Sequence, residues 1–366
     1  MSGYQVEYSM VYVCESEWVS GAVMRCAESE RANDALDLDR GACTSTPNDR
    51  PRRASATGRI HSSINQPTNA PVATLLILHL RSVHRMEDEI AKHCESIIHV
   101  LQHDPPASSN LVLHCFPLES FEQVSAAAPD VFRTVKLVHF VRHGQGEHNA
   151  AQERAGYPCG CALDPPRCPY LDVALIDARL TERGRREASE LQHKTKALAV
   201  DRIIVSPLSR AIETAQLGFA GVDAPTQCFE VFREQMGRHV PDQRRATSEL
   251  VRDFPHVDFS RLEHESDELW KPERETKRAL IDRARSGIEL LESLAERHVA
   301  LVGHSSWLLA CFGAVLQCHT SFDAFRNNEQ PISVSTPGWA DRYWFHTAEL
   351  RSLVIAYQER PSTTTL

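Results

Sequence analysis

VKLVHFVRHG, residues 135–144, is a largely apolar run that ends in residues of a very different kind. The β-branched and aromatic residues of Val135–Val141 predict a strand buried inside a sheet. Arg142 and His143 come directly after that strand, and Gly144 follows them. Ligands of open α/β sheets collect beyond the carboxyl ends of the strands, so the sequence predicts that these polar side chains face a ligand.

The alternation of short apolar runs and amphipathic stretches continues from this strand to the C-terminus. We predict strands at residues 202–205, 227–232, 298–302, 341–346 and 350–357, and helices at 181–198, 208–219, 275–297 and 305–316. A polar passage, residues 233–271, interrupts the pattern. Alternating strands and helices are typical of an α/β domain. We therefore expect a three-layer sandwich, in which helices flank a mostly parallel central sheet, over residues 131–366.

The chain before residue 131 has a weaker pattern. Residues 1–70 mix small, polar and charged side chains without a period, which predicts a flexible leader of low order. Residues 71–130 hold an apolar run, a helix-like stretch that stops at Pro105, and a short strand candidate, Leu111–Pro117. We treat this second part as a poorly defined N-terminal extension whose structure the sequence leaves open.

Composition excludes several classes of protein. The 366 residues are 42% hydrophobic and 24% charged, as in an ordinary globular protein, and the formal net charge is −9. Binding to nucleic acid or to an anionic membrane needs a basic face, which this charge argues against. The apolar run Ala73–Leu80 is far shorter than the roughly 20 residues of a membrane span. Glu7 and Glu15 argue against a targeting peptide, and an odd count of 11 cysteines fits reduced thiols, so we predict a cytoplasmic protein.

Four segments place an Arg, a His or a Glu just past the end of a predicted strand. They are Arg142-His143-Gly144, Ser206-Pro207-Leu208-Ser209-Arg210, Phe232-Arg233-Glu234 and Val302-Gly303-His304-Ser305. Because the carboxyl ends of parallel strands share one edge of a sheet, we expect these side chains to converge. Guanidinium groups, imidazoles and a carboxyl group in one place suit a dianionic phosphate ester.

The chemistry of phosphoryl transfer explains these residue types. Negative charge spreads over the equatorial oxygens, which fork-shaped guanidinium groups bind well, so Arg142 and Arg210 are predicted phosphate ligands. A neutral imidazole can attack phosphorus and hold the group as a phosphohistidine, and His143 is the candidate. The leaving oxygen must gain a proton and the attacking water must lose one, which Glu234 can do in turn. A lone histidine is more often a hydrogen-bonded core residue and a glutamate is usually solvated, but their grouping with two arginines favours a site.

These residues resemble the motifs of a known family. The segment Phe140–Asn149, FVRHGQGEHN, is similar to the Arg-His-Gly signature of the histidine phosphatase superfamily, and residues 180–184, 206–215, 232–234 and 302–305 resemble its later motifs in order. The likeness covers about two-thirds of the chain and is nearest to the phosphoglycerate mutase-like branch. It implies a catalytic set of His143, Glu234 and His304, with His143 as phosphorylated nucleophile and Glu234 as proton donor, and phosphate contacts from Arg142, Arg210, His304 and Asn149.

Two further groups have alternative interpretations. Arg244-Arg245 could bind a second anionic group of the substrate or form a solvated basic pair. Cys159, Cys161 and Cys168 lie close together in sequence, but the four-ligand spacing of a zinc site is missing. We therefore predict no metal and no cofactor.

Together the residues and the resemblance predict a metal-independent phosphomonoester hydrolase that acts on a small phosphorylated metabolite. One alternative is phosphoryl transfer of the phosphoglycerate mutase type, although Gln235-Met236-Gly237 stand where cofactor-dependent mutases of the family usually have a tyrosine. Another is a protein that binds phosphate without turnover, which would predict loss of the nucleophile or of a clamping arginine. The sequence leaves the substrate and the oligomeric state open.

Overall fold

The computed structural model describes residues 90–104, 109–128, 130–156 and 168–360 of the chain. The flexible leader predicted for residues 1–70 and the apolar run Ala73–Leu80 lie outside these ranges. Within the described ranges, no helix is both long enough and apolar enough to cross a membrane.

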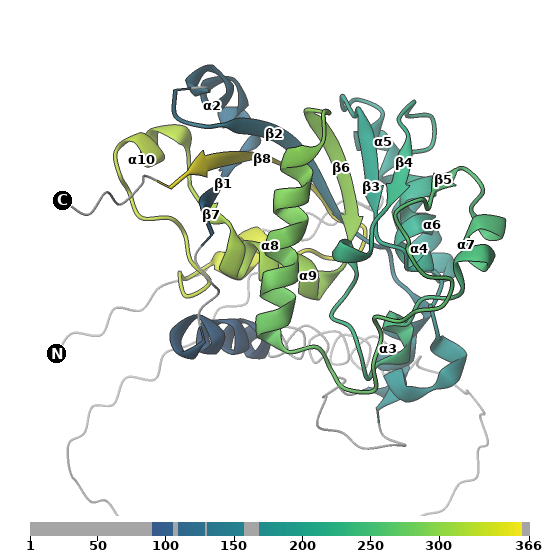
Figure 1. Cartoon of the computed structure of the whole chain (residues 1–366). Helices are drawn as coiled ribbons and strands as arrows, with labels where there is room; N and C mark the ends of the chain where they lie inside the picture. Colours follow the sequence, from purple (N-terminus) through teal and green to yellow (C-terminus); the bar gives the residue numbers. More distant parts are fainter. Residues whose placement is uncertain (1–89, 105–108, 129, 157–167, 361–366) are drawn as a thin grey trace, which may run out of the picture. The chain divides into compact units, whose positions relative to one another are not determined.

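One sheet of eight strands forms the centre of the described structure (Figure 1). Its order is β5 (Val257–Asp258), β4 (Thr226–Cys228), β3 (Arg202–Val205), β6 (His298–Gly303), β2 (Thr134–Arg142), β8 (Leu350–Glu359), β1 (Leu111–Pro117) and β7 (Gln317–Cys318). The neighbours from β5 to β2 are all parallel, and β1 is parallel to β7. Among the described strands only β8 runs the other way, between β2 and β1. The predicted α/β class with a mostly parallel central sheet is confirmed.

Helices cover both faces of this sheet. They are residues 90–103, α2 (Phe121–Ala127), α3 (Glu147–Ala155), α4 (Glu182–Glu190), α5 (Gln192–Thr195), α6 (Ser209–Gly218), α7 (Thr247–Asp253), α8 (Lys277–Ser293), α9 (Ser305–Ala310), α10 (Phe322–Arg326) and α11 (Trp339–Tyr343). On one face α8, α9 and residues 90–103 surround Phe140 and Leu301. On the other face α6 and α7 cover Val141 and Val302, and α4 packs on α6. Successive residues of β2 and β6 thus enter opposite cores, which gives the expected three layers.

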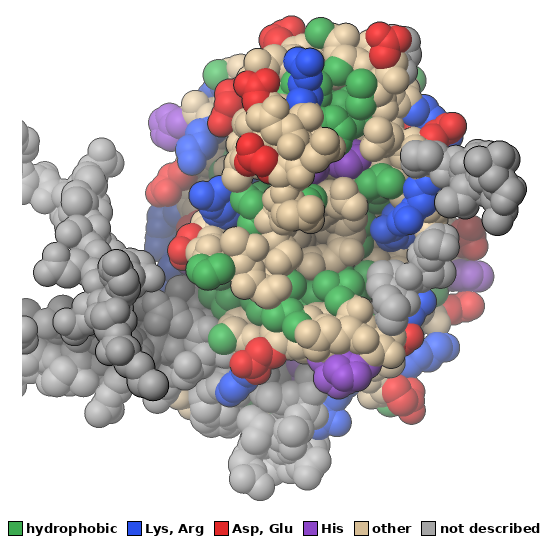
Figure 2. Space-filling model, turned by 90° about the vertical axis from the view of Figure 1, so that its left-hand side faces the viewer, with side chains coloured by type: hydrophobic (Ala, Val, Ile, Leu, Met, Phe, Trp, Pro, Cys, Tyr) green, Lys and Arg blue, Asp and Glu red, His purple; other side chains and the backbone are tan. Residues whose placement is uncertain are grey.

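A third, smaller core lies under α2 and α10, at the end of the sheet that carries β1 and β7. It is built largely from aromatic rings, among them Phe116, Phe132, Phe322 and Phe325. Figure 2 looks onto the side that lies at the left in Figure 1, where α10 is drawn. Apolar and uncharged atoms occupy much of the middle of this face, and charged side chains gather mostly toward its rim.

The described part of the predicted extension, residues 71–130, is built into the same sheet and core. The strand predicted at Leu111–Pro117 is confirmed as β1, which pairs with β8 along its whole length. Ile97, from the helical residues 90–103, is 1% exposed and belongs to the core that α8 and α9 cover. This segment therefore stabilises the sheet from the side of β8 that faces away from β2.

The strand predicted at residues 341–346 is wrong, because α11 occupies this part of the chain. The aromatic residues Tyr343, Trp344 and Phe345 favour a strand by propensity. Trp339 and Tyr343 are four residues apart and both enter the core, as the spacing of a helix face requires. Gly338, in the left-handed region at φ 75°, turns the chain into this helix.

Two other elements end differently from the prediction. The strand predicted at residues 227–232 ends at Cys228, and a short 3₁₀ turn, Glu230–Phe232, follows it. The helix predicted at residues 305–316 changes after α9 into a π-helical turn, Cys311–Val315. The first change lies at the carboxyl end of β4, and the second lies between α9 and β7.

Several histidines are buried in or beside the sheet. His139 of β2 is hydrogen-bonded to Oγ of Ser352 at 2.8 Å, and His114 of β1 to His319 at 3.0 Å. Burial lowers the pKa of His139 and that of His319 to about 4, and it also lowers the pKa of His114. All three rings are therefore neutral near pH 7.

We expect acid to destabilise the protein from about pH 6.5 downward. Unfolding frees the buried rings to bind protons at their ordinary pKa of 6.5, so the unfolded state gains protons before the folded state does. The free energy of unfolding then falls with pH between 6.5 and about 4, by up to about 1.4 kcal/mol per pH unit for each ring. Urea denaturation at several pH values measures this slope. His139→Gln should make the slope shallower, and an unchanged slope would contradict the assignment.

Candidate active site

The ends of neighbouring parallel strands bring the predicted residues together. β6 lies between β2 and β3, and Val302 is paired with Val141 on one side and with Val205 on the other. His143 follows β2 and His304 follows β6, and their ring centroids lie 5.0 Å apart. The first and last of the four sequence segments therefore meet at the carboxyl edge of the sheet.

The ring of His143 is held in one tautomer. Its Nδ1 lies 2.7 Å from the carbonyl oxygen of Gly144, and because a carbonyl can only accept, Nδ1 carries the proton. Nε2 receives a hydrogen bond from Nε of Arg210 at 3.3 Å. Burial lowers the pKa of His143 well below its usual value, and the charges of Arg210 and Arg142 lower it further. The free site therefore holds a neutral imidazole with its lone pair on Nε2.

Arg210 is fully buried in the first turn of α6, and the protein fixes its orientation. Nη1 donates to the carbonyl oxygen of Pro241 at 2.6 Å, and Nη2 donates to Oδ1 of Asp242 at 2.9 Å. The start of α6 is fixed in turn, since Asp177 accepts a hydrogen bond from the backbone N–H of Ser209 at 2.7 Å. A guanidinium group whose orientation is already fixed loses little conformational entropy when an anion binds.

Arg142 and His304 flank the nucleophile from two other segments. Nη1 of Arg142 donates to the carbonyl oxygen of Phe345 at 2.8 Å, and its guanidinium lies 5.6 Å from the ring centre of Trp344. Nε2 of His304 is hydrogen-bonded to Oγ of Ser206 at 2.7 Å, while Nδ1 is buried without a hydrogen-bond partner in the described ranges. Buried polar atoms are seldom left unpaired, so Nδ1 of His304 is suited to binding a ligand.

The loop that carries His143 packs directly against α4. Oγ1 of Thr181, the N-cap of α4, accepts from the backbone N–H of Gly184 at 3.0 Å and donates to Oε1 of Gln145 at 2.7 Å. A Cβ on Gly184 would lie 2.1 Å from the carbonyl oxygen of Gln145, and one on Gly144 would lie 2.5 Å from that of Gly184. The two backbones can approach this closely only because both positions are glycine.

The start of α3 adds one predicted residue and one that the sequence prediction does not include. Oδ1 of Asn149 accepts from the backbone N–H of Gly146 at 3.0 Å and so caps α3. His148 is buried, and its ring centroid lies 5.6 Å from that of His143. Its Nδ1 has no hydrogen-bond partner among the residues that the structure describes. The signal that could have identified His148 is its place beside Asn149 in the FVRHGQGEHN segment.

Glu234 is buried against the first turn of α9. Its carboxylate accepts from the backbone N–H of Gln235 at 2.8 Å and from that of Ser306 at 3.1 Å. Burial raises the pKa of Glu234, but these backbone hydrogen bonds and the charges of Arg210 and Arg274 outweigh burial and lower it to about 2. In the free site Glu234 is therefore an ionised carboxylate.

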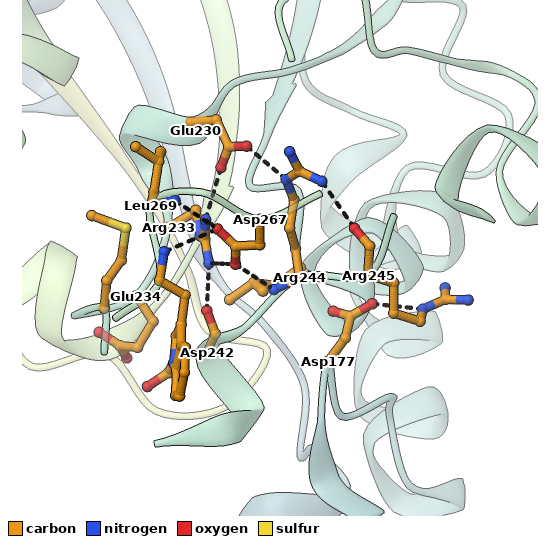
Figure 3. Close-up of polar contacts among 12 residues, drawn as sticks. Asp177, Glu230, Arg233, Glu234, Asp242, Arg244, Arg245, Asp267 and Leu269 are labelled. Atoms are coloured by element: carbon orange, nitrogen blue, oxygen red, sulfur yellow. Dashed lines mark hydrogen bonds and ion pairs between the residues drawn. The ribbon is translucent and has the colours of Figure 1, made fainter. Parts of the chain in front are cut away.

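The residue before Glu234 belongs to a buried network of ion pairs (Figure 3). Arg233 pairs with Asp267 at 2.5 Å and with Glu230 at 3.1 Å. Arg244 pairs with Glu230 at 2.7 Å. Its other four N–H groups donate to the backbone carbonyl oxygens of Arg245, His264, Glu265 and Ser266. Because the protein uses every N–H group of Arg244, the predicted contact with substrate is not supported, and Arg244 braces the loop beside Glu234 instead.

Arg245, the second half of the predicted basic pair, also contacts protein groups. It donates to Asp177 at 2.9 Å, to Asp253 at 2.9 Å and to Oγ of Ser209 at 3.1 Å. Asp177 and Ser209 are the two residues that fix the first turn of α6. Arg245 therefore helps to fix the helix end that carries Arg210.

Of the three cysteines considered above, Cys168 lies within the described ranges, whereas Cys159 and Cys161 lie outside them. Cys168 is buried, with Sγ 4.0 Å from Nε2 of His239. No group of three or more His, Cys, Asp or Glu side chains in the described part of the chain is arranged to hold a metal ion.

The contact between α4 and the nucleophile loop generates a prediction. Gly184→Ala should lower the free energy of unfolding by about 3 kcal/mol, because the new Cβ meets backbone atoms that cannot move alone. Ser189→Ala on the same helix should stay within about 0.5 kcal/mol of the wild type. Urea denaturation compares the two variants. Equal midpoints would show that the loop can move away without cost.

Comparison with known proteins agrees with this arrangement. A family model described as histidine phosphatase superfamily (branch 1) matches residues 173–347, which include Arg210, Glu234 and His304 but not His143. A phosphoglycerate mutase-like protein of Arabidopsis thaliana is 31% identical over 216 residues, 49% of this chain and 75% of that protein. A probable phosphatase of Schizosaccharomyces pombe is 28% identical over 178 residues, 46% of this chain and 74% of that protein.

A solved structure, a putative α-ribazole-5′-P phosphatase from Escherichia coli, is 18% identical and has a TM-score of 0.31, covering 48% of this chain and 76% of that chain. The family assignment rests on the sequence likeness alone. The Arabidopsis protein is matched over 75% of its length, and the family model covers three of the four segments that meet at the sheet edge. The chain belongs to the histidine phosphatase superfamily.

Proposed function

We propose that the protein is a metal-independent phosphomonoester hydrolase that moves the phosphoryl group of a small phosphorylated metabolite first to His143 and then to water. The observation that supports this most is the state of His143. Its Nδ1–H is bound to the carbonyl oxygen of Gly144, and its neutral Nε2 lies 3.3 Å from the buried guanidinium of Arg210. A nucleophile and a phosphate clamp are thus already side by side.

In the first step the lone pair of Nε2 forms a bond to phosphorus while the ester P–O bond breaks. Arg210, which donates to Nε2 in the free site, would then donate to a phosphoryl oxygen, together with Arg142 and Nδ1 of His304. The imidazole becomes positive as the P–N bond forms. The carbonyl oxygen of Gly144 stabilises that charge through the hydrogen bond from Nδ1.

The low pKa of Glu234 decides how the protons move. An ionised Glu234 is ready to take a proton from the water that attacks the phosphohistidine in the second step. To act as acid in the first step it must first gain a proton. A phosphate monoester has a second pKa of about 6, so an ester that binds as the monoanion can give that proton to Glu234 and remain bound as the dianion. The negative charge of the phosphate beside Glu234 also raises the carboxyl pKa.

The named relatives support hydrolysis and phosphoryl transfer as the general chemistry. The Schizosaccharomyces pombe relative is named a probable phosphatase, and the Arabidopsis relative is named phosphoglycerate mutase-like. The substrate class that we propose, a small phosphorylated metabolite, can be tested by phosphate release from sugar phosphates, nucleotides, phosphoglycerates and phosphopeptides.

His143→Ala should lower turnover by at least about 10³-fold, since the covalent intermediate can no longer form. Phosphate release with a chelator present measures turnover, and the wild type should be unaffected by the chelator. Far-ultraviolet circular dichroism should show an unchanged fold. His256→Ala, at an exposed histidine outside the site, is the matched control and should keep full activity. Full activity in His143→Ala would remove the mechanism.

Glu234→Gln should slow esters with poor leaving groups by about 10²-fold or more but activated aryl phosphates far less, because only the former need a proton on the leaving oxygen. The measurement is kcat for an alkyl phosphate and for an aryl phosphate in the same variant. Equal slowing of both would exclude Glu234 as the acid.

A further inference from the structure

We propose that Asp242 is a positioning residue that couples the phosphate clamp to the proton donor. It does so through a bridge of three side chains, Arg210, Asp242 and Arg274, which we call the Asp242 bridge. The inference rests on the proposed function, because it concerns how Arg210 and Glu234 are held relative to each other. None of the sequence motifs includes Asp242.

The geometry of the bridge is that of one carboxylate shared by two cations. Asp242 is 5% exposed. Its Oδ1 accepts from Nη2 of Arg210 at 2.9 Å, and its Oδ2 accepts from Nη1 of Arg274 at 2.8 Å. The backbone oxygen of Asp242 also accepts from Nη2 of Arg233 at 2.6 Å, which fixes the main chain at this point. Neither carboxylate oxygen can change its partner without releasing a guanidinium, buried in Arg210 and partly buried in Arg274.

On one side the bridge sets the direction of Arg210. Nη2 is bound to Asp242 and Nη1 to the carbonyl oxygen of Pro241, so the planar guanidinium can turn only if both contacts break. Its remaining edge carries Nε, which lies 3.3 Å from Nε2 of His143. Asp242 therefore determines where Arg210 meets the phosphoryl group.

On the other side the bridge fixes the turn that follows Glu234. Nη1 of Arg274 also lies 2.6 Å from the carbonyl oxygen of Gln235 and 2.9 Å from that of Gly237, so its two N–H groups are shared among these oxygens and Oδ2 of Asp242. Gly237 has φ +80°, and a Cβ there would lie 1.9 Å from the carbonyl oxygen of Glu273. The turn after Glu234 therefore has little freedom of its own, and Arg274 ties it to the same carboxylate that holds Arg210.

An electrostatic role and a positioning role of Asp242 predict opposite changes in phosphate affinity when its carboxylate is neutralised. Asp242→Asn removes a negative charge from the site, which by electrostatics alone would make phosphate bind more tightly. If Asp242 acts by position, Arg210 is released and phosphate binds more weakly, since a displacement of about 1 Å can cost up to about 10²-fold. The direction of the change therefore identifies the role.

The experiment is a calorimetric titration of the full chain with inorganic phosphate. We expect Asp242→Asn to weaken phosphate binding by about 10-fold. The matched control is Glu213→Gln, which also neutralises a buried carboxylate that pairs with two arginines. Glu213 lies on α6, and its partners are Arg179 and Arg185 rather than Arg210. The control should stay within about 2-fold of the wild type. Unchanged or tighter binding by Asp242→Asn overturns the proposal.

Arg274→Met tests the coupling even if Asp242→Asn does not fold. Arg274 is not bound to Arg210 by any described contact, but its loss frees one oxygen of Asp242, so phosphate binding should weaken by about 3-fold or more. The same variant should slow poor leaving groups more than activated ones, because the turn after Glu234 is released. Unchanged phosphate binding in Arg274→Met overturns the bridge.

The two proposals fail in different ways. A wild type that hydrolyses no ester and forms no phosphohistidine removes the proposed function, while the phosphate titration still decides for or against Asp242. A wild type that is active, together with an Asp242→Asn variant that binds phosphate as tightly as the wild type, keeps the function and removes the bridge.

Discussion

The contact between Nε of Arg210 and Nε2 of His143 is the interaction on which the rest of the site depends. A guanidinium group with no exposed surface must be paired, and Asp242 and the carbonyl oxygen of Pro241 pair it. The same charge, together with burial, keeps the rings of His143 and His304 neutral. The positive charge of the free site therefore lies on the arginines, and the Nε2 lone pair of His143 stays unprotonated, which is the combination that attack on a phosphate ester requires.

The sheet brings Arg210 and His143 together although they are far apart in the sequence. Because β2, β6 and β3 are parallel neighbours in register, the residues that follow them emerge at one edge. Glycine at 144 and 184 then lets α4 press against the nucleophile loop. The site is thus a product of strand order and of two close backbone contacts, and side chains complete it.

The strands at 135–141, 202–205 and 298–302 could be predicted from sequence because a strand buried on both faces is a run of apolar residues. The roles of Arg244 and Arg245 could not, since their partners Glu230 and Asp177 are chosen by the fold. The ionised state of Glu234 depends on an amide of α9 that lies far away in the chain. Asp242 lies in no sequence motif, and the aromatic residues Tyr343, Trp344 and Phe345 favour a strand where the chain forms α11.

The position of β8 has a consequence for folding during synthesis. Among the described strands it comes last in the chain, yet it pairs with both β1 and β2, which come first among them. Until β8 has been synthesised, β1 and β2 each lack one of their neighbours in the sheet, and such unpaired strand edges recruit chaperones or neighbouring chains. The high contact order of these pairings also implies slow refolding once the protein has been denatured.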